Sequence, residues 1–215
     1  MLWSKAAGAG GTLGGGAALV SQYLGYCGDN VASGGAITVS SADLGTYDTS
    51  RLIVVAVVGS FGHNPSSVTV NGVSATMVAG PASTSGNFGQ VWVASASGTS
   101  GDIVVSGASG TAFGFHWYAV YTETPTPSAV VDNDASTFST DITVYSSGVV
   151  VGAISTRADS AIDDVTMDTA GDVITYGPIV SYSSGRYGFT WIALPTESAS
   201  PTTFNFSAVS EGGNK

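Results

Sequence analysis

The chain has 215 residues, of which 43% are hydrophobic and only 9% are charged, so it can bury a sizeable core in one large or two small domains. Its net charge of -10 leaves no basic surface, which disfavours nucleic acid and anionic membranes as partners. Glu and Lys, which helices use heavily, are nearly absent, and Cys27 has no second cysteine with which to form a disulfide.

Residues 1–35 are predicted to form a Gly-rich N-terminal arm, with Ala17–Tyr26 as its only helix candidate. Glycine loses the most backbone entropy on ordering, so we expect contacts with other chains to order the arm. Glycine also interrupts this stretch too often for a signal peptide. The apolar residues of the arm pack either on their own domain or on a partner; the candidate partner-binding residues are Trp3, Leu13, Leu19 and Tyr23.

From residue 36 to residue 215 the sequence predicts an antiparallel, jelly-roll-like β-sandwich, because short β-prone runs alternate with Gly, Ser, Asn and Pro. The expected strands are Ala36–Ser40, Arg51–Val58, Ser67–Val70, Val73–Val78, Gly89–Ala94, Asp102–Ser106, Ala112–Tyr121, Ala129–Val131, Asp141–Tyr145, Gly148–Ile154, Val173–Tyr176, Ile179–Tyr182, Tyr187–Leu194 and Thr202–Ser207.

Two local features sharpen this prediction. Asn71-Gly72 is typical of a tight type I′ hairpin, because both residues accept a positive φ. The runs Leu52–Val58 and Phe113–Tyr121 are apolar on both faces, so only one face of each can fill a two-sheet core. We expect the other face to be covered by loops, by the arm or by another subunit.

The sequence also contains an internal repeat. Residues 85–94 and 184–193 share the pattern S-G-x-[FY]-G-x-x-W-[VI]-A, with an apolar run upstream and a β-prone run downstream of each. The repeat predicts two similar halves, 36–121 and 129–207, joined by a Pro-containing linker at 122–128. They form either two packed half-sandwiches or two small domains, and we favour a single sandwich because each half has few strands.

The residues give no sign of catalysis or of a cofactor. The three Glu lie in loops or the tail, and neither His63 nor His116 has a partner pattern for a triad or a zinc site. The acidic stretch around 158–171 is expected to be a solvated loop, with Asp163, Asp164 and Asp168 as weak calcium candidates. Trp92, Trp117 and Trp191 lie in apolar strands, so core packing is favoured over sugar binding.

The succession of Arg51–Val58, Ser67–Thr76 with its Asn-Gly turn, Gly89–Ala94 and Gly101–Ser106 resembles β-sandwich modules of tailed-bacteriophage virion proteins. The resemblance covers residues 36–207 and implies a structural role without functional residues to carry over. We therefore expect a non-enzymatic virion protein, made in the host cytoplasm. In this reading it is a capsid decoration or cement protein that the arm anchors to the major capsid protein or to other virion proteins.

Two further expectations follow. A tail or fibre position is the nearest variant, and a carbohydrate-binding adsorption module is the alternative from a different functional class. Because the doubly apolar strands need a cover and the chain has few Lys to guard strand edges, we also expect a homo-oligomer, with a trimer preferred.

Overall fold

The structure is a computed structural model, and it describes residues 2–4, 21–28, 35–60, 65–80, 87–107, 112–121, 137–144, 150–156, 162–167, 173–176, 180–183, 186–194 and 202–210. Every regular element in these ranges is a strand, and every strand pair is antiparallel. The predicted all-β, antiparallel β-sandwich class is therefore confirmed.

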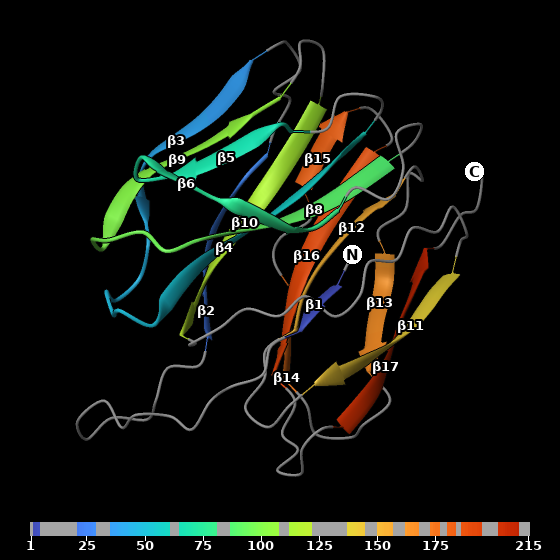
Figure 1. The fold of residues 1–215 in the computed structure, drawn as a ribbon. Helices are drawn as coiled ribbons and strands as arrows, with labels where there is room; N and C mark the ends of the chain where they lie inside the picture. The colour runs from blue at the N-terminus through green and yellow to red at the C-terminus, as the bar shows by residue number, and fades with distance from the viewer. Residues whose placement is uncertain are drawn as a thin grey trace.

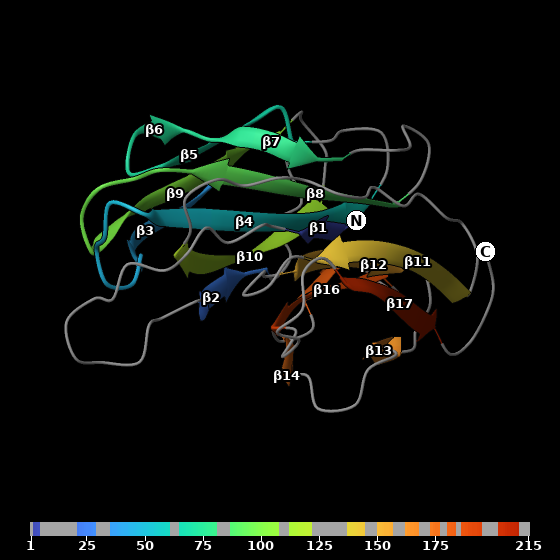
Figure 2. The ribbon, with the colours of Figure 1, turned by 60° about the horizontal axis from the view of Figure 1, so that its bottom comes forward.

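The first half of the chain supplies two sheets. Sheet I has the strand order β3-β9-β5-β6, and sheet II has the order β2-β10-β4-β8-β7. Their strands are β2 (Ser21–Cys27), β3 (Ala36–Asp43), β4 (Arg51–Ser60), β5 (Ser67–Val70), β6 (Val73–Ser74), β7 (Thr76–Ala79), β8 (Asn87–Ala94), β9 (Ser100–Ser106) and β10 (Ala112–Tyr121). Figure 2 shows the strands of sheet II in this order, from β7 at the top to β2 at the bottom.

The second half supplies two more sheets. Sheet III has the order β1-β12-β16-β14, with β15 also paired to β16, and sheet IV has the order β11-β17-β13. Their strands are β1 (Leu2–Ser4), β11 (Thr137–Val144), β12 (Val150–Thr156), β13 (Ile162–Met167), β14 (Val173–Tyr176), β15 (Val180–Ser183), β16 (Arg186–Leu194) and β17 (Thr202–Ser210). Apart from β1, no described strand of one half joins a sheet of the other half.

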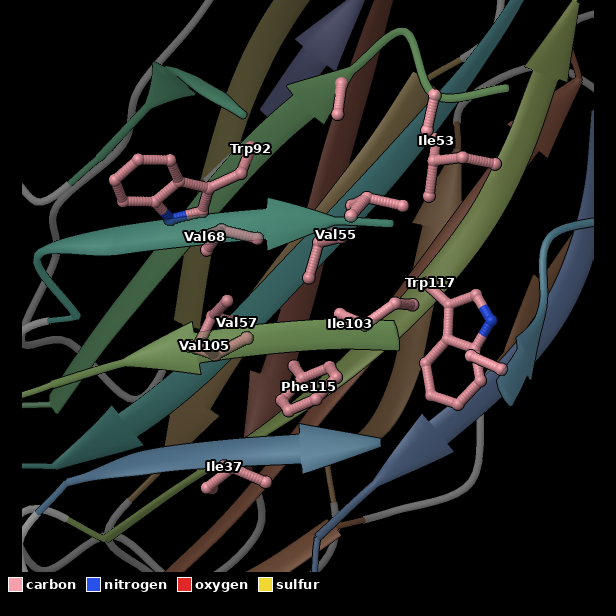
Figure 3. Packing of buried hydrophobic residues seen from close by; sticks show 14 of the residues in the cluster. Ile37, Ile53, Val55, Val57, Val68, Trp92, Ile103, Val105, Phe115 and Trp117 are labelled. Atoms are coloured by element: carbon pink, nitrogen blue, oxygen red, sulfur yellow. The ribbon is translucent and has the colours of Figure 1, made fainter. Parts of the chain in front are cut away.

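Sheet II is covered by another sheet on each of its two faces. One face packs on sheet I through a large apolar cluster, in which Ile53, Val55 and Val57 of β4 face Val68, Ile103 and Val105 (Figure 3). The other face packs on β12 of sheet III through a second cluster; its members are Val54, Ala56, Val58, Ala79, Val91, Tyr118, Val120, Val151 and Ala153. Figure 1 shows sheets I, II and III following one another, with sheet IV beyond them.

This arrangement corrects one expectation. The second apolar face of β4 and β10 is covered by a sheet of the same chain, whereas the sequence suggested loops, the arm or another subunit. The expected homo-oligomer rested on that uncovered face, so this reason for it no longer holds. The oligomeric state stays a prediction to be measured.

The internal repeat in the sequence corresponds to a repeat in strand pairing. In the first half β9 lies between β3 and β5, and β8 lies between β4 and β7. In the second half β17 lies between β11 and β13, and β16 lies between β12 and β14. The two tryptophans of the shared motif hold matching positions, since Trp92 pairs with Val55 of β4 and Trp191 pairs with Gly152 of β12.

Among the described strands of the second half, none takes the place of β10. In sheet II, β10 pairs with the outer edge of β4, and in sheet III the N-terminal strand β1 pairs with the corresponding edge of β12. The most N-terminal described strand therefore completes the most C-terminal pair of sheets. The order of the chain alone gives no hint of this pairing.

Several strand predictions are confirmed, among them the Asn-Gly hairpin. Asn71 has φ 47° and Gly72 has φ 77°, and Val70 pairs with Val73 across the turn. The expected strand Val73–Val78 is divided at Ala75 into β6 and β7. The chain passes there from sheet I, which contains β6, to sheet II, which contains β7. The expected strand at 129–131 and the linker at 122–128 lie outside the described residues.

Two sequence interpretations are wrong. The expected helix Ala17–Tyr26 is replaced over Ser21–Cys27 by β2, which pairs with β10. The expected acidic loop is replaced over Ile162–Met167 by β13, which pairs with β17. In both places a neighbouring strand provides backbone hydrogen-bond partners, and local composition does not reveal such a partner.

Candidate functional site

The guanidinium of Arg51 is the most heavily bonded charged group in the part of the chain that the structure describes. Arg51 begins β4, and its side chain is almost fully buried. Nη1 donates to the carbonyl oxygens of Leu44 and Gly45 at 2.9 and 3.1 Å, and Nη2 donates to those of Ala96 and Gly98 at 2.6 and 2.8 Å. One side chain thus ties together two loops at one end of the sheet I–II sandwich.

The surroundings of Arg51 fit a structural role. Burial lowers the pKa of Arg51, but an arginine remains protonated in proteins. The ring of Tyr47 lies 5.4 Å from the guanidinium carbon, which adds a cation–π contact. Four carbonyl acceptors of its own chain bind the two Nη atoms, and Nε is buried without a hydrogen-bond partner among the described residues.

A second cluster lies where β2 joins β10. His116 is fully buried, and its Nδ1 lies 3.4 Å from the hydroxyl of Tyr23. The ring of Tyr26 stacks on His116 at 5.8 Å between centroids, and the ring of Tyr118 meets Tyr23 edge-on at 5.4 Å. The Nε2 atom of His116 is buried without a hydrogen-bond partner among the described residues.

Burial controls the ionisation of this cluster. It lowers the pKa of His116 from 6.5 to about 3, so the imidazole is neutral near pH 7. Burial, followed by the influence of Tyr26, raises the pKa of Tyr23 to about 12. A neutral imidazole next to a phenol that holds its proton, with no carboxylate described beside them, lacks the acid–base pair of a triad.

A β-bulge explains how both tyrosines reach the same histidine. Tyr26 pairs with His116 and Gly25 with Trp117, but the register then shifts so that Tyr23 pairs with Tyr118. Leu24 is the extra residue, and it places two tyrosines three positions apart on one face. That spacing is also typical of a helix, which is why this segment looks helical in the sequence.

The tryptophans with described side chains belong to the core. Trp92 is 7% exposed and donates from Nε1 to Oε1 of Gln90, and Trp117 is 5% exposed and donates to the carbonyl oxygen of Asp43. Their indole groups are therefore paired and buried, as expected. The side chain of Trp191 lies outside the described residues.

Described carboxylates accept hydrogen bonds in turns and, for Asp102, from the neighbouring strand β3. Oδ1 of Asp43 accepts from the backbone N–H of Gly45, and Oδ1 of Asp102 accepts from that of Ser41. Asp48 accepts from both the backbone and the hydroxyl of Ser50, and these hydrogen bonds hold its pKa below the usual value. No group of three or more metal-ligating side chains occurs in the described ranges.

Of the four predicted partner-binding residues, only Trp3 and Tyr23 lie in the described ranges. Tyr23 is half-buried on its own sheet, and Trp3 belongs to β1, where it pairs with Val151. Leu13 and Leu19 lie outside the described residues. The chain itself pairs with β1 and β2, so the prediction that only other chains order the arm does not hold for these two strands.

The calcium candidates are placed only in part. Asp163 and Asp164 lie in β13, where the register with β17 shifts between Ile162 and Asp164, and Asp168 lies outside the described residues. Sequence reasoning missed the binding of Arg51 to carbonyls and the His116–tyrosine cluster. The spacing of Tyr23 and Tyr26 was the available signal for the cluster, but it fits a helix equally well.

The fold and these side chains define an all-β protein built from stacked antiparallel sheets, whose described buried polar groups serve its architecture. No family model, curated protein or solved structure matches the chain. No described segment is an apolar helix of a length that could cross a membrane.

Proposed function

We propose that this chain is a non-enzymatic structural protein of a bacteriophage particle, most simply a capsid decoration protein. The observation that supports the proposal best is the use of the buried polar groups. Arg51 binds four backbone carbonyls, and His116 packs against the rings of Tyr23 and Tyr26, so both serve to hold strands and loops in place.

A structural role also agrees with the way the sheets are joined. Sheet II has apolar clusters on both faces, and the second cluster joins the two halves of the chain. Joining the halves through a buried apolar layer restrains their relative motion, which suits a protein that must bear load across subunit joints. The sequence resemblance to phage β-sandwich modules points the same way.

We propose that the anchor is the part of the arm between β1 and β2, which contains Leu13 and Leu19. In a Leu13→Asp/Leu19→Asp variant β1 and β2 keep their sequence, and the segment gains charges that an apolar interface rejects. We expect the variant to fold but to be lost from purified particles. Thr12→Asp is the matched control, because it adds charge to the same segment without removing an apolar side chain.

Mass spectrometry of purified particles gives the deciding measurement. Hundreds of copies of this chain per particle are expected for a decoration protein, and a handful would indicate a tail or fibre position. Absence of the chain from the particle would contradict the proposal. Full occupancy by the Leu13→Asp/Leu19→Asp variant would show that the arm is not the anchor.

The alternative function is carbohydrate binding, and one observation favours it. Tyr26 and Tyr47 are about half exposed, at 48% and 49%, and exposed aromatic rings can stack on sugars. A glycan array with the whole chain would test this. Binding that is lost in Tyr47→Ala or Tyr26→Ala would favour an adsorption module over a decoration protein.

A further inference from the structure

The edge of β12 holds a much shorter strand than the corresponding edge of β4. In sheet II, β10 pairs with β4 over ten residues, from Arg51 to Ser60. In sheet III, β1 pairs with β12 over three residues, from Val150 to Gly152. β12 continues for four more residues beyond the described ladder, from Ala153 to Thr156.

In the other half of the repeat, the corresponding edge is paired along its whole length by a strand, β10. β4 and β12 have the same place in the two halves, next to the tryptophan strands β8 and β16. The edge of β4 pairs with β10, which belongs to the same half of the chain. The edge of β12 pairs with β1, which comes from the opposite end of the chain. The pairing that holds β1 to sheet III is therefore short, and the next described strand along the chain, β2, belongs to sheet II.

The connection between β1 and β2 is long enough for β1 to reach another molecule. Residues 5–20 separate the two strands, and sixteen residues span at most roughly 50 Å when extended. That reach exceeds the roughly 30 Å diameter of a small domain, so it would extend to a second copy packed against the chain. A connection of this length can deliver β1 either to its own β12 or to the β12 of the neighbour.

We propose that β1 is exchanged between copies, so that Leu2–Ser4 of one chain pairs with Val150–Gly152 of a second copy of the same chain. The exchanged state contains the same strand pairs as the closed monomer, so the two states differ little in contact energy. Concentration then selects between them: the closed form dominates in dilute solution, and exchange dominates where copies are crowded. This inference rests on the proposed structural role only for the supply of neighbouring copies.

Ser4 and Val150 allow a direct test, because they are partners in the ladder. Partners in antiparallel strands lie roughly 4.5–5.5 Å apart at Cα, which is within the range of a disulfide. In a Cys27→Ser background, one variant carries Ser4→Cys and a second carries Val150→Cys. The two are unfolded together, refolded together at micromolar or near-millimolar concentration, and oxidised.

Exchange predicts a disulfide-linked dimer of the two variants that increases with concentration. It should exceed, by about tenfold, the dimer formed by a Ser74→Cys and Val150→Cys mixture, since Ser74 is exposed on β6 and reports random collisions. The double variant Ser4→Cys/Val150→Cys is the positive control. At micromolar concentration it should form the disulfide within one chain.

Two results would overturn the inference. One is a mixed pair that cross-links no more than the collision control while the double variant cross-links internally, because β1 then stays with its own chain. The other is a double variant that forms no disulfide, because the β1–β12 pairing then fails in solution. Neither result affects the proposed structural role, which depends on the copy count in the particle.

Discussion

Gly89 of β8 lies directly against the backbone of Ala153 in β12, where the two halves of the chain meet. A Cβ atom at position 89 would stand 2.9 Å from the carbonyl oxygen of Ala153. The sheets approach this closely because position 89 has no side chain. Gly89 is also part of the repeated motif, so the same residue marks the repeat and admits the neighbouring sheet.

Gly89→Ala should therefore weaken the joint between the halves. The atom that it meets is backbone, which cannot rotate away, so sheet III must shift, and we expect a loss of about 1–3 kcal/mol in the free energy of unfolding. Urea denaturation measures the loss. Thr76→Ala, at an exposed position of the neighbouring strand β7, is the control and should change stability little. Wild-type stability in Gly89→Ala would show that β8 and β12 can move apart at little cost.

Arg51→Lys should destabilise the loops at the end of the sheet I–II sandwich. A single ammonium cannot reach four carbonyls in two directions, so buried acceptors lose their donors at a cost on the order of 2–4 kcal/mol. The free energy of unfolding in denaturant is the measurement. Tyr47→Leu removes only the cation–π contact and should cost about 0.5–1 kcal/mol. Equal losses in the two variants would contradict the importance of the carbonyl contacts.

His116 should make the protein less stable in acid. Burial lowers its pKa from the ordinary value of 6.5 to about 3 in the folded chain, so between these two pH values the unfolded chain binds a proton that the folded chain excludes. Stability from this group is complete above pH 6.5 and is lost as the pH falls toward 3, at roughly 1.4 kcal/mol per pH unit. Denaturation of wild type and His116→Phe between pH 7.5 and about pH 4 measures the difference.

The difference between wild type and His116→Phe isolates this group from the carboxylates, which titrate in both proteins. Tyr23→Phe is the matched control, because it removes the hydroxyl next to Nδ1 and keeps the titrating imidazole. We expect Tyr23→Phe to retain the wild-type pH dependence. If His116→Phe has the same pH dependence as wild type, the imidazole is not held neutral in the fold.

Gly72→Ala should cost about 1 kcal/mol through backbone conformation alone. Gly72 has φ 77°, and nothing lies within 4 Å of the place that a Cβ would take, so the added methyl group meets no atom. Gly72→Asn should cost less, because asparagine tolerates a positive φ better than alanine does. Thermal or urea unfolding compares the two. An alanine loss no larger than the asparagine loss would contradict this account of the turn.

The sequence by itself determined the features that depend on neighbouring residues in the chain. Alternating apolar residues predicted strands such as β5, Asn71-Gly72 predicted the hairpin, and the repeated tryptophan motif predicted two halves of similar plan. It also identified β4 and β10 as strands that need a cover on both faces. These signals are local, because side-chain alternation and turn geometry are set within a few residues.

Only the tertiary structure decided what each strand pairs with and what covers it. β2 is a strand because β10 offers it a ladder and a bulge at Leu24 accommodates its tyrosines, and β13 is a strand because β17 lies beside it. The cover over β4 is sheet III, which the N-terminal strand β1 completes. A strand satisfies its backbone hydrogen bonds with residues far away in the chain, so its own residues do not name its partner.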